Sequence, residues 1–91
     1  MDLIVLTPDK KVFEGKVNRI SVPGVEGEFE VLDNHAPIVS SLGGGSILIT
    51  SAESKEVINL MIQSGFIEVL DNKVSLLVQE GKAVEASAQA E

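Results

Sequence analysis

Asp33, His35, Ser40 and Ser41 lie close together in the sequence and are of the types that a hydrolytic site uses. A catalytic serine needs a base beside it and a third group that orients the base. No nucleophile-elbow motif surrounds either serine. A metal site needs two or three converging histidine or carboxylate ligands, but His35 is the only histidine and the chain has no cysteine. The sequence therefore predicts neither a catalytic residue nor a metal ligand.

Two interpretations of His35 remain. It follows Asp33-Asn34, a turn signature, and precedes Ala36-Pro37, which interrupts a strand. The ring of a turn histidine can pack or hydrogen-bond locally. It can also contact a partner protein, because loop residues carry function more often than buried ones.

Carboxylates recur at every second position in Glu26, Glu28 and Glu30. A period of two is typical of a strand with one buried face, so the row should point to solvent. Carboxylates that act in acid–base catalysis need burial to separate their pKa values. The row is therefore a solvated strand face or an acidic patch for a basic partner. The residues expected on the opposite, inward face are Val25, Gly27, Phe29 and Val31.

Gly43-Gly44-Gly45 is the one glycine-rich run. A phosphate-binding loop would need a following Lys-Ser or Lys-Thr pair and a helix, and neither follows. The run is expected to supply a turn or bulge with positive φ between two strands.

The elements that must position these residues are short strands bounded by turn residues. Gly15 is expected to end one of them, and Asp71-Asn72-Lys73 to form a hairpin turn. The apolar run 57–63 is expected to be covered on both faces. These features predict an all-β sandwich of about eight to ten strands. The expected strands are 3–6, 11–14, 17–22, 25–32, 38–42, 47–50, 57–63, 66–70 and 74–78.

Composition limits the partners. The 91 residues suit one domain, with an aliphatic core because aromatic residues make up only 3%. The net charge of −7 argues against nucleic acid and anionic lipid, and favours a basic protein surface.

No signal peptide or bilayer-spanning run is evident. Residues 1–80 are expected to form the domain, and residues 81–91 a polar, Ala-rich tail that is frayed or weakly helical.

The order of these pieces resembles the epsilon subunit family of F-type ATP synthases. The similarity extends over residues 2–80, and its most specific part is the acidic GVEGE segment followed by HAP. The matching pieces are VFEG at 12–15, ISVPG at 20–24, GVEGEF at 24–29, NHAP at 34–37 and GFIEV at 65–69.

The resemblance implies a flattened β-sandwich of about ten strands, belonging to a non-catalytic rotor subunit without a cofactor. Such a subunit helps to couple proton flow to ATP synthesis from the central stalk. The implied partners are the gamma subunit, the c-ring and the catalytic alpha/beta head. The implied location is peripheral, on the cytoplasmic face of the bacterial inner membrane, with no insertion into the bilayer.

The resemblance also implies two adjoining contact surfaces. An acidic loop would meet basic loops of the c-ring, and the histidine turn would face gamma. The residues carried over are Glu26, Gly27 and Glu28 for the c-ring, and His35, Ala36 and Ser40 for gamma.

Three departures from the family pattern stand out. The chain ends at Glu91 without the two C-terminal helices of full-length relatives, as expected for a short form or a shortened chain. Glu30 stands where the family often has glycine, and Ser64-Gly65 replaces a Gly-Gly pair. The alternative function is a stand-alone acidic β-sandwich that binds a protein or a sugar.

Overall fold

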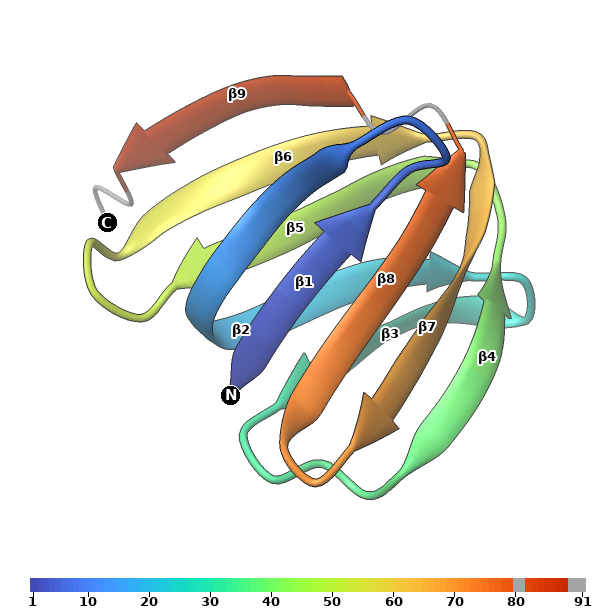
Figure 1. The fold of residues 1–91 in the computed structure, drawn as a ribbon, viewed down its shortest axis with the longest axis horizontal. Coiled ribbons are helices and arrows are strands. Elements are labelled where there is room, and N and C mark those ends of the chain that lie inside the picture. The colour runs from blue at the N-terminus through green and yellow to red at the C-terminus, as the bar shows by residue number, and fades with distance from the viewer. Residues whose placement is uncertain (80–81, 89–91) are drawn as a thin grey trace.

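The computed structural model describes residues 1–79 and 82–88, and within them the regular structure consists of strands alone (Figure 1). This confirms the predicted all-β sandwich, with nine strands over the described residues where about ten were expected. The strands are β1 (Asp2–Leu6), β2 (Lys11–Gly24), β3 (Gly27–Leu32), β4 (Ile38–Leu42), β5 (Gly45–Ser51), β6 (Glu56–Ile62), β7 (Ser64–Leu70), β8 (Lys73–Gln79) and β9 (Lys82–Ala88).

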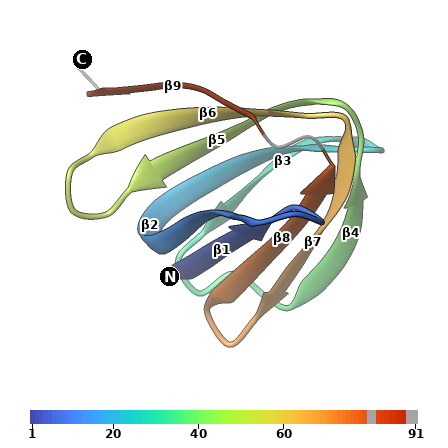
Figure 2. The same ribbon diagram turned by 45° about the horizontal axis from the view of Figure 1, so that its top comes forward.

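The strands form two layers that share one strand (Figure 2). In the first layer β1 runs parallel to β8, and β8, β7 and β4 pair antiparallel in that order. In the second layer the order is β3, β2, β5, β6 and β9, all antiparallel. The first half of β2 also pairs with β1, so it ties the two layers together.

The expected break at Gly15 is wrong. β2 continues through Gly15, which pairs with Leu3 of β1, and extends over 14 residues. Glycine has only a weak preference against strands, and pairing along both halves of β2 overrides it. One long strand therefore replaces two short ones.

The core between the layers is aliphatic, as the composition predicted. Among the residues whose side chains are described, no buried residue is polar. Burying one Val, Leu or Ile fully stabilises the fold by about 1.5–3 kcal/mol relative to exposure. The buried residues are Leu3, Val5, Val17, Ile20, Val22, Val31, Leu42, Ile47, Ile49, Leu60, Ile62, Ile67, Val69, Val74, Leu76 and Val78.

Two turn predictions are confirmed. Asp71 and Asn72 form a two-residue hairpin turn, with φ of 53° and 61°. Positive φ at both central residues matches the right-handed twist of the flanking strands, and Asp and Asn tolerate it. Gly45 has a φ of 150°, as expected for the glycine run, and an added Cβ would lie 3.2 Å from Pro23 Cβ.

Two expectations, one for the end of the chain and one for β6, are corrected. Within the predicted frayed or helical tail, residues 82–88 form β9, because the edge of β6 offers backbone groups for a further strand to pair with. Residues 80–81 and 89–91 of that tail lie outside the described residues. β6 is not covered on both faces: Leu60 and Ile62 face the core, whereas Met61 is exposed.

The close approach of β7 to β8 gives a test of the packing. A Cβ on Gly65 would lie 2.6 Å from the Leu77 carbonyl oxygen and 3.0 Å from Val78 Cγ1. We expect Gly65→Ala to lower the free energy of unfolding by about 1–3 kcal/mol, because backbone must shift. Urea unfolding would measure this.

Gly15→Ala is the matched control, since its Cβ would meet only the Phe13 ring at an ordinary 3.5 Å. We expect a change within about 0.5 kcal/mol for this variant. Equal losses for the two variants would contradict the described β7–β8 packing.

Candidate interaction surfaces

The segment with the acidic residues forms the tip of the β2–β3 hairpin. Gly24 and Gly27 pair across a turn made by Val25 and Glu26, and Gly27 has a φ of 132°, which favours glycine. The first layer holds this tip in place. Val25 N–H donates to the Ser41 carbonyl oxygen at 3.1 Å, and Gly43 N–H donates to the Pro23 carbonyl oxygen at 2.8 Å.

The predicted alternation is confirmed over β3. Val31 is buried and Phe29 is half-buried, whereas Glu28 and Glu30 are exposed. The exceptions are Val25, which is 62% exposed, and Gly27, which is also exposed, because they lie in and beside the turn, where the pleat is interrupted. The expectation that these two residues face inward is wrong.

The three glutamates of the row differ in their surroundings. Glu30 pairs with Arg19 of β2, with 3.2 Å between Oε2 and Nε. Glu26 and Glu28 are exposed and form no ion pair with the residues that the structure describes. Two uncompensated carboxylates therefore project from the tip, where a basic partner could reach them.

A shallow hollow of about 570 Å³ lies between this tip and β4. Residues 24–29 line one side, and Val39, Ser40 and Ser41 line the other. Val39 is 71% exposed, so it adds an apolar side chain next to the carboxylates. We call residues 25–28 and 39–41 together the acidic tip.

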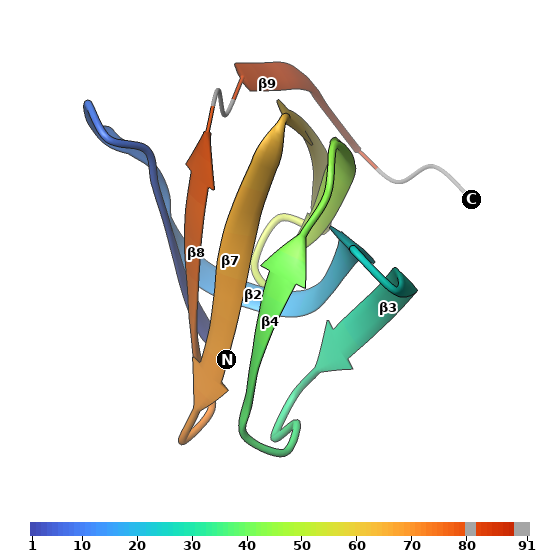
Figure 3. The same ribbon diagram turned by 90° about the vertical axis from the view of Figure 1, so that its right-hand side faces the viewer.

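His35 lies in the connection from β3 to β4, at the opposite end of β3 (Figure 3). Its N–H donates to the Leu32 carbonyl oxygen at 3.1 Å, and its ring Nδ1 lies 2.7 Å from the Ala36 carbonyl oxygen. A carbonyl can only accept, so Nδ1 donates and Nε2 remains for another contact. We call residues 33–36 the histidine turn.

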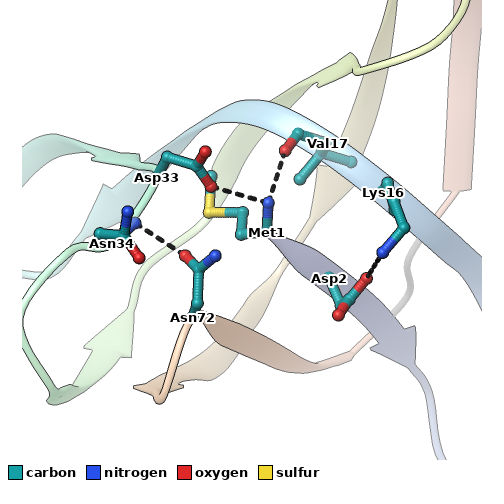
Figure 4. Close-up of polar contacts among 7 residues, drawn as sticks. All are labelled: Met1, Asp2, Lys16, Val17, Asp33, Asn34 and Asn72. Carbon is teal, nitrogen blue, oxygen red and sulfur yellow. Dashed lines mark hydrogen bonds and ion pairs between the residues drawn. The ribbon is translucent and has the colours of Figure 1, made fainter.

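Two neighbouring segments hold the histidine turn (Figure 4). The Met1 ammonium donates to Asp33 Oδ1 at 2.8 Å and to the Val17 carbonyl oxygen at 3.2 Å. Asn34 N–H donates to Asn72 Oδ1 at 2.7 Å. The hydrogen bond from the ammonium, helped by Asn72, lowers the pKa of Asp33 below its ordinary value of 3.8. Sequence reasoning identified Asn72 only as a turn residue.

The acidic tip and the histidine turn do not adjoin, contrary to the prediction. β3 has 6 residues and separates them, which corresponds to roughly 15–20 Å at about 3.3 Å per residue. The structure brings Ser40 to the acidic tip, together with Glu26, Gly27 and Glu28. His35 and Ala36 lie at the other end of the molecule's first layer, beside Asn72.

A third exposed feature is apolar. Leu6, Leu77 and Phe66 are neighbours across β1, β8 and β7, beside a hollow of about 520 Å³. Leu77 and Phe66 are each about half exposed.

The described residues hold no group of three or more His, Cys, Asp or Glu side chains that could bind a metal ion. Over the same part of the chain, no helix has the length and hydropathy to cross a membrane.

The ion pair between Asp33 and the Met1 ammonium should make the stability of the fold depend on pH. Because its pKa is lowered in the folded chain, the carboxylate stabilises the fold above pH 3.8, and this contribution is lost as the pH falls through the lower, folded value. We expect Asp33→Asn to be less stable than the parent at neutral pH, and the difference to disappear in strong acid. Urea unfolding across this range measures it.

Asp71→Asn is the matched control, because it removes an exposed carboxylate from the adjacent hairpin turn. Its difference from the parent should change less with pH. A constant difference between Asp33→Asn and the parent would refute the ion pair.

The sequence matches a family model described as ATP synthase, Delta/Epsilon chain, beta-sandwich domain, over residues 1–84. The chain is 42% identical to the ATP synthase epsilon chain of Leptospira borgpetersenii over 81 residues, which cover 89% of this chain and 62% of that protein. It is 38% identical to the epsilon chain of Magnetococcus marinus over 91 residues, covering 97% and 65%. The chain thus spans less than two thirds of the length of these relatives.

Two solved structures contain chains of similar fold. A chain of the Euglena gracilis mitochondrial ATP synthase, in a structure of OSCP, F1 and c-ring, superposes with a TM-score of 0.81 at 25% identity, over 89% of this chain and 51% of that one. A chain from the central stalk and c-ring of the Tetrahymena thermophila enzyme has a TM-score of 0.72 at 20% identity, over 90% and 65%, and shows the shared fold. The chain therefore belongs to the ATP synthase delta/epsilon chain family, and residues 1–84 match its β-sandwich domain.

Proposed function

We propose that the chain is a central-stalk subunit in the rotor of a proton-translocating ATP synthase, where it binds gamma and the c-ring and helps to couple ion flow to ATP synthesis. The observation that carries this proposal is the family match over residues 1–84. The subunit itself contributes no catalytic group and no cofactor. It acts at the membrane surface, on the cytoplasmic face of a bacterial inner membrane, without entering the bilayer.

The acidic tip is the proposed contact with the c-ring, through Glu26, Gly27 and Glu28. Glu26 and Glu28 are exposed, and the chain carries a net charge of −7. Basic loops of a ring would meet these carboxylates without displacing an ion partner from the described residues. Exposed charge pairs of this kind guide approach and register more than they add affinity.

The histidine turn is the proposed contact with gamma, through His35 and Ala36. Nδ1 of the ring is engaged with the Ala36 carbonyl, which fixes the ring and leaves Nε2 for a partner. Ser40 is proposed as a third gamma contact. It lies in the hollow at the acidic tip, so gamma would extend along β4 from the histidine turn toward the ring.

Charge reversal at the tip tests the ring contact. We expect Glu28→Lys to raise the Kd for a detergent-solubilised c-ring roughly three- to tenfold at low salt, because an attractive pair becomes repulsive. The effect should shrink as salt screens it. Binding of the labelled chain to the immobilised ring measures both.

Glu56→Lys is the matched control, since it makes the same charge change at the start of β6, far from the Ile62 end that lies near the tip. We expect less than a twofold change there. Equal effects at the two positions would indicate general charge attraction and would contradict a localised contact.

Truncation of the histidine tests the gamma contact. We expect His35→Ala to raise the Kd for purified gamma subunit about three- to tenfold while changing thermal stability little, because the ring is only half-buried. Calorimetric titration and a melting curve measure the two quantities. If neither gamma nor the ring is retained by the parent chain at micromolar concentration, the rotor proposal fails and a stand-alone binding module becomes the better account.

A further inference from the structure

Asn72 lies outside the proposed contact residues, yet its side chain reaches the histidine turn. It occupies the β7–β8 hairpin turn, and its Oδ1 accepts the Asn34 N–H at 2.7 Å (Figure 4). These two residues are 38 positions apart in the sequence. The hydrogen bond therefore joins the β7–β8 turn, which lies within the first layer, to the segment between β3 and β4, which passes from one layer to the other.

The same residue is tied to one further segment at this end of the sandwich. Its carbonyl oxygen accepts the Asp2 N–H at 3.2 Å, which fixes it to the start of β1. Its side chain also helps to lower the pKa of the Asp33 carboxyl, within the histidine turn. Asn72 is half-buried, so the bonds are partly shielded from competing water.

The hydrogen bond acts on the backbone directly before His35. Asn34 has a φ of 62°, a left-handed conformation that a non-glycine residue adopts only when its surroundings support it. With Asn34 N–H held by Asn72 and His35 N–H held by the Leu32 carbonyl, successive amides of the turn are fixed. The direction in which His35 and Ala36 leave the turn is thereby set.

We propose that Asn72 is a positioning residue for the gamma contact: its Oδ1 holds the histidine turn in the conformation that presents His35 and Ala36 to gamma. This inference rests on the proposed function and adds to it a residue that need not touch gamma at all. A loop held before binding loses less conformational freedom on binding, so the affinity depends on the restraint.

Glycine is the appropriate replacement for Asn72. It removes the side-chain acceptor but accepts the positive φ of 61° that alanine would resist. Asp71→Gly is the matched control, because Asp71 is the other residue of the same turn and has a φ of 53°. The two variants therefore make the same backbone change, and only Asn72→Gly removes the bond to Asn34.

The experiment measures the Kd for purified gamma subunit with six forms of the 91-residue chain: the parent, N72G, D71G, H35A, and the double variants N72G/H35A and D71G/H35A. We expect N72G to raise the Kd roughly three- to tenfold, as loss of one hydrogen bond typically does, and D71G to raise it less than twofold. In the H35A background N72G should have a smaller effect than in the parent, because one of the two side chains that it positions is then missing. Amide hydrogen exchange at Asn34 should be faster in N72G than in D71G.

Three results would overturn the inference, and they are distinguishable. If H35A weakens binding but N72G matches D71G, Asn72 does not position the contact, and the proposed function survives. If N72G weakens binding equally in the parent and H35A backgrounds, Asn72 acts elsewhere. If H35A leaves the Kd unchanged, the gamma contact itself fails and this inference fails with it.

Discussion

The structure depends on β2 pairing with both layers at once. Its first half pairs with β1, and its second half pairs with β5 on one side and β3 on the other. Val17, Ile20 and Val22 are fully buried along its length, so the strand that joins the layers is also anchored in the core between them. A sandwich whose layers share a strand is constrained against sliding of one layer over the other.

Both proposed contact surfaces depend on this strand. The acidic tip begins where β2 ends at Gly24, and the Met1 ammonium that holds Asp33 also donates to the carbonyl of Val17 within β2. β3 then sets the distance between the surfaces. A small domain can in this way present two separate faces in a fixed relation, as a subunit placed between two parts of a rotor would require.

The sequence was sufficient where local chemistry decides the structure. The aliphatic core, the turn at Asp71 and Asn72 and the outward glutamates of β3 each follow from residue types and spacing. It was not sufficient where distant segments decide. Gly15 stays within β2 because β1 pairs with it, and residues 82–88 form a strand because β6 has an edge to pair with.

The same limit applies to the contact residues. Glu26, Gly27 and Glu28 could be grouped from the sequence because they are consecutive on one hairpin. Ser40 lies beside them because the chain passes from one layer to the other between β3 and β4. The same passage brings Asn34 to Asn72, whose Oδ1 accepts its N–H. Neighbours in the sequence such as His35 and Ser40 are thus divided between the two surfaces.

The proposed function requires that the sandwich bind gamma and the c-ring at the same time, gamma at the histidine turn and Ser40, and the ring at Glu26, Gly27 and Glu28. The most direct measurement is the mass and composition of the complex formed when the chain, purified gamma and detergent-solubilised c-ring are mixed. We expect a ternary complex, in which the ring captures a preformed complex of the chain with gamma. If saturating gamma instead displaces the chain from the ring, the two partners compete for the same residues and simultaneous binding is refuted.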